Sequence, residues 1–170
     1  MKRITAVACF ALTSGCLWAG GFGVGVQTAF DLGRGNAIAP RLEYQRYTDS
    51  SSVGGGIDLS ATVNSFSLGA DYNYFTSGRT GKGFYLLAGL GVARANFSVT
   101  GSAAGFTSRT TSNQTVLYPE GGIGWQFNRY LGAEVLYKAM NFNDVTVVVA
   151  GVPAGYSFSG SLQADLVVRF

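Results

Sequence analysis

The chain has 170 residues, of which 47% are hydrophobic, a formal net charge of +3 and no histidine. Its length suits one domain. The missing histidine excludes Ser–His hydrolysis and imidazole metal sites, because a serine hydroxyl alone is a weak nucleophile.

Residues 1–19 are predicted to form a cleaved signal peptide. Two basic residues come first, an apolar run spans 4–12, and small residues follow, with cleavage placed after Ala19. The apolar run is shorter than the roughly 20 residues of a membrane-spanning helix. A lipoprotein signal lipidated at Cys16 and a buried N-terminal helix are the alternatives. The predicted mature domain is 20–170.

Removal of the signal peptide changes the composition. Both cysteines, Cys9 and Cys16, leave with it, so no disulfide or thiolate site is expected. Taking Lys2 and Arg3 from the 12 basic residues leaves 10 against 9 acidic residues. This balance gives no reason to expect a nucleic-acid partner.

Segments with alternating apolar and polar residues follow along the mature chain, and this alternation predicts β-strands. Several are about ten residues long, which exceeds the usual five or six and matches a tilted strand that crosses a bilayer. The seven segments are 21–30, 37–47, 65–75, 83–97, 117–127, 131–140 and 162–170.

The links between these segments alternate in length. Short links are 31–37, 76–83 and 128–130, and long links are Thr48 to Ser65, Ser98 to Thr115 and Asn141 to Ser157. Short turns on one side and long loops on the other are typical of an outer-membrane barrel, with the short turns in the periplasm. A soluble β-sandwich, with its polar face in water, is the alternative interpretation.

Aromatic residues gather beside the short links, which predicts an aromatic belt at the periplasmic membrane interface. Frequent glycines on the polar face suit the crowded interior of a small barrel. The aromatic residues beside the short links are Phe30, Tyr74, Phe75, Phe84, Tyr85, Trp125, Phe127 and Tyr130.

Charged residues on the polar face are predicted to line the lumen. Because unpaired charges in a narrow interior are costly, we expect them to form a network that plugs the barrel. The predicted lumen charges are Arg41, Glu43, Asp71, Glu120, Glu134, Lys138, Asp165 and Arg169. Two other arginines, Arg46 and Arg94, break the apolar pattern of the lipid-facing side near the long links, beyond the hydrocarbon.

Four stretches together resemble the small bacterial outer-membrane β-barrel proteins: SLGADYNYF, GFYLLAGLGVARANF, GGIGWQFNRYLGAEVLYKAMNF and LQADLVVRF. The resemblance implies an all-β fold, a small antiparallel up-and-down transmembrane β-barrel surrounded by outer-membrane lipid. It also implies that Phe170, with Val168 and Leu166, is the signal read by the barrel-assembly machinery.

The strand count departs from this family, whose members typically have eight strands and both termini in the periplasm. Seven strands are visible here, so the barrel is expected to be eight-strand-like. An eighth strand is sought in 9–20, 49–65 or 141–157. Alternatively, the strand that starts near Gly21 lies directly beside the C-terminal strand.

The predicted function is a structural or surface-interaction role in the bacterial outer membrane, with a plugged lumen, long extracellular loops, no cofactor and no enzymatic activity. A narrow channel for small hydrophilic solutes and a soluble periplasmic lipid-binding β-barrel are the alternatives. Bilayer conductance tests the first of these and membrane fractionation tests the second. Asp49, Asp58 and Asp144 are candidate calcium ligands, although they lack the spacing of a calcium loop. No extracellular ligand is indicated.

Overall fold

The computed structural model describes residues 5–7, 20–53, 56–128 and 130–168, and within these ranges all regular structure is β-strand. No helix in the described part of the chain is long and apolar enough to cross a membrane. The strands are β1 (Thr5–Val7), β2 (Gly20–Gly33), β3 (Asn36–Val53), β4 (Ile57–Phe75), β5 (Gly83–Ala103), β6 (Phe106–Gln126), β7 (Leu131–Lys138), β8 (Val145–Val149), β9 (Val152–Tyr156) and β10 (Ser161–Val168).

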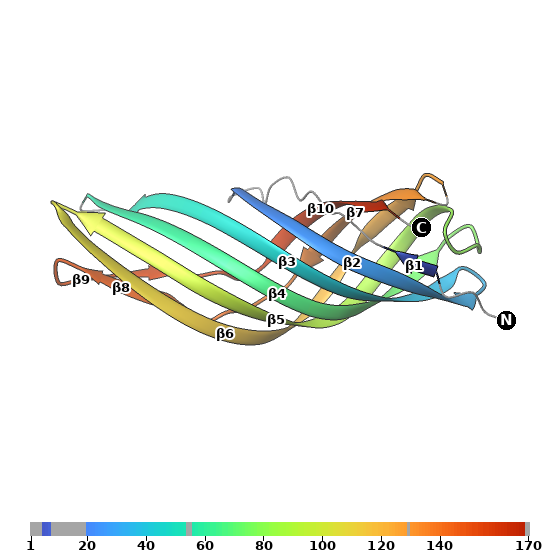
Figure 1. Ribbon diagram of the computed structural model, residues 1–170, viewed down its shortest axis with the longest axis horizontal. Helices are drawn as coiled ribbons and strands as arrows, with labels where there is room; N and C mark the ends of the chain where they lie inside the picture. The colour runs from blue at the N-terminus through green and yellow to red at the C-terminus, as the bar shows by residue number, and fades with distance from the viewer. Residues whose placement is uncertain (1–4, 8–19, 54–55, 129, 169–170) are drawn as a thin grey trace.

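Eight strands form one antiparallel sheet in the order β1-β2-β3-β4-β5-β6-β7-β10, and β8 and β9 form a separate hairpin. The molecule is elongated, and the sheet curls along its whole length (Figure 1). The predicted all-β, antiparallel, up-and-down architecture is therefore confirmed.

The eighth strand comes from a place that the sequence did not suggest. Thr5–Val7 of β1 pairs with residues 27–29 of β2, although 1–19 is the predicted signal peptide. Residues 1–4 and 8–19 lie outside the described residues. Among the described residues no backbone pairing joins β10 to β1 or to β2, so the direct β2–β10 pairing that the sequence suggested is not present there.

Two of the three predicted long loops are instead continuations of strands. Residues 48–65 belong almost entirely to β3 and β4, and 98–115 belong to β5 and β6, which reach 21 residues each. The third, 141–157, contains the β8–β9 hairpin. The long links were mistaken for loops because they are rich in serine, threonine and glycine. Their alternation of apolar and polar residues nevertheless continues, and threonine is a good strand former.

Two-residue turns with left-handed backbone close three of the hairpins. Both residues have positive φ in Arg34–Gly35 (54° and 78°), Ala104–Gly105 (46° and 84°) and Ala150–Gly151 (50° and 82°). Paired left-handed residues match the twist of the flanking strands, which is why such turns join hairpins. We call the end of the molecule with the Val53–Ile57 pair and the Ala104–Gly105 turn the hairpin end, and the opposite end the turn end.

The half of the sheet near the turn end has an apolar outer face and a mixed inner face, where buried polar and charged residues lie beside a small apolar cluster. On β4, Phe66, Leu68, Tyr72 and Tyr74 are exposed on the outside, whereas Asp71 is buried on the inside. This outer band spans about ten residues of the strand, which is the length that crosses a bilayer when tilted. We call this half the barrel.

The half near the hairpin end has the opposite polarity. We define the extension as residues 46–64 of β3 and β4 and 94–115 of β5 and β6. Serine, threonine, asparagine and arginine occupy most of its outer face, and its inner face is apolar on β4 and β5. The inward residues of β6 there are polar: Ser108, Thr110, Ser112 and Gln114. At about 3.3 Å per residue, its strands are about 26 Å long on β3 and β4 and about 33 Å long on β5 and β6.

The β8–β9 hairpin packs against the inner face of the extension and completes its core. Val145, Val147 and Val149 of β8 are buried in one cluster with Leu59 of β4 and Phe97 of β5. The hairpin lies behind β5 and β6 at the left of Figure 1. The extension is thus a two-layered structure of the kind found in soluble proteins, continuous with the barrel.

We predict that Phe97→Ala destabilises the extension by about 3–5 kcal/mol, because it leaves a cavity in a packed core. Phe97 is 1% exposed, and its ring centroid lies 5.1 Å from that of Phe142. Hydrogen exchange should show faster exchange in the extension than in the barrel. The matched control is Phe106→Ala at the hairpin end, where Phe106 is 64% exposed and a change within about 0.5 kcal/mol is expected. Equal effects of the two substitutions would contradict the packed core.

Candidate functional site

Arg41 of β3 contacts four carboxylates inside the barrel. Its Nη2 lies 2.6 Å from Oε2 of Glu134, and its Nε lies 2.9 Å from Oδ2 of Asp71. Its Nη1 lies 3.1 Å from Oε1 of Glu43 and 3.4 Å from Oδ2 of Asp165. The side chain is 5% exposed. One guanidinium therefore links β3, β4, β7 and β10 through charge-assisted hydrogen bonds.

Lys138 of β7 is the second cation in the lumen, and it is fully buried. Its Nζ contacts the carboxylate of Glu43 and lies 3.8 Å from Oε2 of Glu120. It also lies 5.6 Å from the ring centroid of Tyr118. Glu43 is thus shared between Arg41 and Lys138, which makes the charges one connected network.

Tyrosine and glutamine side chains extend this network, whereas only charged residues were expected in it from the sequence. The hydroxyl of Tyr85 donates to Oε1 of Glu134 at 2.6 Å. The hydroxyl of Tyr47 donates to Oε1 of Gln45 at 2.6 Å and accepts from Nε2 of Gln163 at 3.0 Å. The strand alternation could have located these tyrosines and glutamines in the lumen, because they lie on the same face of their strands as the lumen charges.

Glycines provide the space for two of these tyrosines. A Cβ atom at Gly91 would collide with the ring of Tyr118, and one at Gly124 would collide with the ring of Tyr85. The two rings therefore occupy the space that a side chain at either glycine would fill. This explains why the lumen face of β5 and β6 carries so many glycines.

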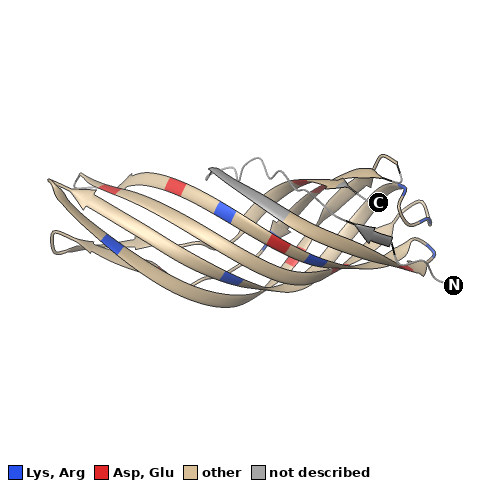
Figure 2. Cartoon of the chain, in the orientation of Figure 1, with Lys and Arg blue, Asp and Glu red and all other residues tan. Residues whose placement is uncertain are grey.

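The lumen holds more acid than base. Of the eight charges predicted to line it, seven are buried together inside the barrel, and Arg169 lies outside the described residues. Five of the nine acidic residues of the chain share two cations there. Within the described residues, both carboxylate oxygens of Glu120 and one oxygen each of Asp71 and Asp165 lack a hydrogen-bond donor. Figure 2 shows the spacing of the charges along the strands.

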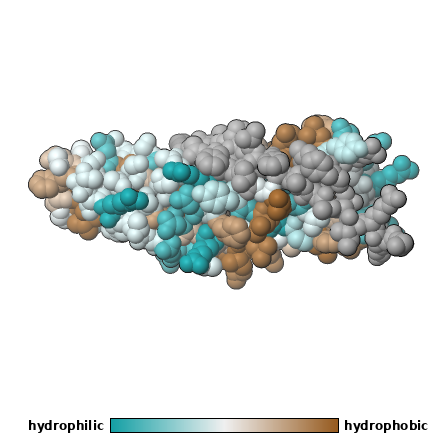
Figure 3. All heavy atoms as spheres, viewed as in Figure 1, coloured by the Kyte–Doolittle hydropathy of each residue, from teal (hydrophilic) through white to brown (hydrophobic). Residues whose placement is uncertain are grey.

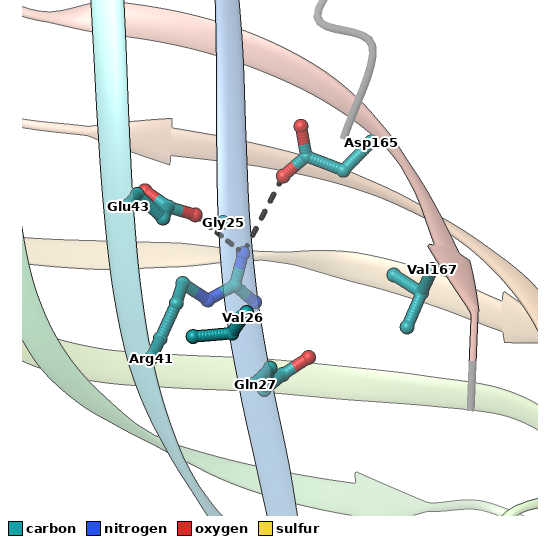
Figure 4. Close-up of a pocket in the computed structure, with 7 residues that line it drawn as sticks. All are labelled: Gly25, Val26, Gln27, Arg41, Glu43, Asp165 and Val167. Atoms are coloured by element: carbon teal, nitrogen blue, oxygen red, sulfur yellow. Dashed lines mark hydrogen bonds and ion pairs between the residues drawn. The ribbon is translucent and has the colours of Figure 1, made fainter. Parts of the chain in front are cut away.

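A cleft between β2 and β10 opens onto the network. In Figure 4 the guanidinium of Arg41 lies between the carboxylates of Glu43 and Asp165. β2 and β10, which no described backbone pairing joins, therefore face each other across this cleft. The lining residues are Gly25, Val26, Gln27, Arg41, Glu43, Asp165 and Val167.

The predicted aromatic belt divides between the two faces of the sheet. Phe75 and Tyr85 lie beside the short turns but are buried in the lumen, so their assignment to the belt is wrong. The strand alternation places them on the inner face. The outward members are Phe30, Tyr74, Phe84, Trp125, Phe127 and Tyr130, of which Phe84 is half-buried and the others are exposed.

The predicted assembly signal lies at the end of β10. Leu166 is 43% exposed on the outer face, and Val168 pairs with Leu131 of β7 through its backbone. Phe170 lies outside the described residues. The role of these residues in assembly stays a prediction.

The outer face of the extension is a polar surface outside the lumen. Arg46, Arg94 and Arg109 project from it among serine, threonine and asparagine side chains. In Figure 3 this half of the molecule is mainly pale and teal, whereas brown residues gather toward the barrel and at the extreme tip. Phe106, Val148 and Val152 are exposed on the turns of the two hairpins at that end.

Carboxylates do not gather into a metal cage. Within the described ranges no three histidine, cysteine, aspartate or glutamate side chains are placed to hold a metal ion. The calcium candidates Asp49, Asp58 and Asp144 therefore do not come together as a site.

Comparison with solved structures identifies a similar fold. The chain resembles Ail, the attachment invasion locus protein of Yersinia pestis, with a TM-score of 0.53 and 13% sequence identity, over 98% of this chain and 95% of that chain. Ail is an outer-membrane β-barrel protein, and its structure was solved in complex with the heparin analogue sucrose octasulfate. No protein-family model and no curated protein matches the sequence. At this identity the likeness establishes the fold, that of a transmembrane β-barrel.

We predict that Lys138→Met lowers the free energy of unfolding by about 3–5 kcal/mol, because Glu43 and Glu120 lose a buried partner. Chemical denaturation of the refolded protein in detergent micelles measures the change. Lys82→Met is the matched control, since Lys82 is exposed at the turn end and should change stability by less than about 0.5 kcal/mol. A loss below about 1 kcal/mol for Lys138→Met would show that water, rather than the lysine, satisfies these carboxylates.

Proposed function

We propose that the chain is a bacterial outer-membrane protein with a surface-interaction role. In this proposal the barrel crosses the membrane, its lumen is closed, and the extension is held at the cell surface as a binding platform. The protein acts by binding rather than by catalysis, and it uses no cofactor. Residues 1–19 serve as the signal for export.

The reversal of polarity along one continuous sheet is the observation that carries this proposal. Apolar side chains such as Phe66, Leu90 and Leu117 are exposed around the barrel, which is unfavourable in water and favourable in lipid. Beyond them the outward residues become polar, and the inward residues of β4 and β5 become apolar. This change of polarity along each strand is expected when one part of the strand crosses the bilayer and the rest projects into water.

The filled lumen supports a binding role over a channel. Arg41, Lys138 and five carboxylates occupy the interior of the barrel, and the β8–β9 hairpin packs into the extension above it. A barrel of about eight strands is only wide enough to be filled by its own side chains. An open path for solutes would require the network to separate.

The likeness to Ail supports an extracellular ligand. That protein was solved with a sulfated sugar. On this chain, the outer face of the extension offers arginines and hydroxyl-bearing side chains that suit a polar or anionic partner. The assembly machinery that inserts barrels into the outer membrane is a second partner, recognising Leu166, Val168 and Phe170.

Cysteine labelling of intact cells tests the proposal. Thr107→Cys at the hairpin end should react with a membrane-impermeant maleimide, because that end is proposed to lie outside the cell. Arg79→Cys at the turn end is the matched control and should react only after the outer membrane is opened. Both positions are exposed, and the native cysteines lie in the predicted signal peptide.

The reverse labelling pattern would contradict the proposed orientation. Recovery of the protein in the soluble periplasmic fraction, with both positions protected until the outer membrane is opened, would support a soluble β-barrel instead.

A further inference from the structure

Arg46 and Arg94 lie where the outer surface changes from apolar to polar. On β3, Arg46 follows Tyr44 in the series of outward residues, and on β5, Arg94 follows Val92 in the same way. Tyr44 and Val92 are the last apolar outward residues before the extension begins, and both are exposed. Both arginines therefore project from the rim of the apolar band.

The register of the sheet places the two arginines near each other. Arg46 pairs with Asn64 of β4, and Arg94 pairs with Phe66 of the same strand. They are thus two strands and two residues apart, which corresponds to about 12 Å between Cα atoms. Their long side chains project from the same face and can converge on one headgroup.

Neither arginine forms an ion pair with any acidic side chain in the part of the chain that the structure describes. All six ion pairs within the described residues lie in the lumen network. Asp58 is the acidic residue on the outer face of the extension. It accepts a hydrogen bond from Ser52 and lies six positions beyond Asn64 along β4. The rim of the apolar band therefore carries uncompensated positive charge.

Polar and aromatic residues complete the surroundings of the two arginines. The hydroxyl of Tyr44 donates to Oδ1 of Asn64 at 3.1 Å, which holds that amide at the rim between the strands of the arginines. Phe66, 52% exposed, lies beside Arg94. Aromatic side chains with adjacent cations are the usual composition of a membrane interface.

We propose that Arg46 and Arg94 form a binding site for the phosphate of an anionic lipid headgroup in the leaflet at the hairpin end. A guanidinium matches a phosphate group with two parallel hydrogen bonds. At this height a headgroup can reach both arginines while its acyl chains lie along Phe66 and Leu90. The site rests on the proposed function, because it requires the barrel to lie in a bilayer.

Lipid binding by the folded full-length protein tests the site. The protein is refolded in phosphatidylcholine vesicles that contain a minority of spin-labelled phosphatidylglycerol or spin-labelled phosphatidylcholine, and the motionally restricted fraction of each label is measured. The wild type should prefer the anionic lipid. Because one basic residue at a membrane surface changes binding about fivefold, the double variant Arg46→Gln/Arg94→Gln should lose most of this preference.

Arg109→Gln is the matched control. Arg109 lies on the same face, and its Nε donates to Oγ of Ser98. Arg94 pairs with Thr115 of β6, and Arg109 lies six positions beyond Thr115 along that strand, away from the apolar band. This variant should keep the preference for phosphatidylglycerol. A retained preference in the double variant, or an equal loss in Arg109→Gln, would overturn the site.

Two further measurements separate the remaining outcomes. Inorganic phosphate added to the wild type should leave the preference for phosphatidylglycerol largely intact; full competition would overturn a lipid site in favour of a soluble-anion site.

Migration of unheated samples on gels reports whether the protein has inserted into the vesicles. Failure of the wild type to insert would overturn the proposed function together with the site, whereas insertion without a lipid preference would overturn the site alone.

Discussion

The structure depends on a constraint that side-chain alternation imposes on a sheet whose strands pass from lipid into water. Successive residues point to opposite faces, so a strand that passes from lipid to water must change its outward residues from apolar to polar. Its inward residues become apolar where another layer of structure covers them. The outer faces of four neighbouring strands change from apolar to polar together, near Arg46, Asn64, Arg94 and Thr115, which the register aligns within two residues. On β4 and β5 the inner faces become apolar at the same level. The barrel and the extension are therefore one sheet with two opposite solvation patterns.

The lumen network is a consequence of the same constraint. Residues that face away from lipid have a narrow interior as their only environment, and buried charges require partners there. Arg41 forms ion pairs with four carboxylates and Lys138 with two, and both cations contact Glu43. Concentrating acid inside leaves the outer surface comparatively rich in lysine and arginine. The arginines at the rim of the apolar band belong to that outer surface.

Much of the barrel could be predicted because its period-two pattern is strong. The pattern located seven strands of the sheet and the face on which Glu134 and Lys138 lie. It could not show that one arginine gathers carboxylates from four strands, because register and closure are long-range properties. The long strands were missed because polar side chains on the water-facing side resemble loop composition. The Ala104–Gly105 turn was missed because alanine seldom adopts positive φ. The pairing of Thr5–Val7 with β2 left no signal beyond a short apolar run.

The height at which the polarity reverses is the central claim, and a nitroxide scan of β4 in lipid bilayers tests it most directly. Single spin labels are placed at the outward positions Ser60, Asn64, Leu68 and Tyr72, and their collisions with oxygen and with a water-soluble nickel complex are compared. Collisions with the nickel complex should dominate at Ser60 and Asn64, and collisions with oxygen at Leu68 and Tyr72, with the crossover beside Phe66. Water accessibility at all four positions, or a crossover displaced to the middle of the extension, would contradict it.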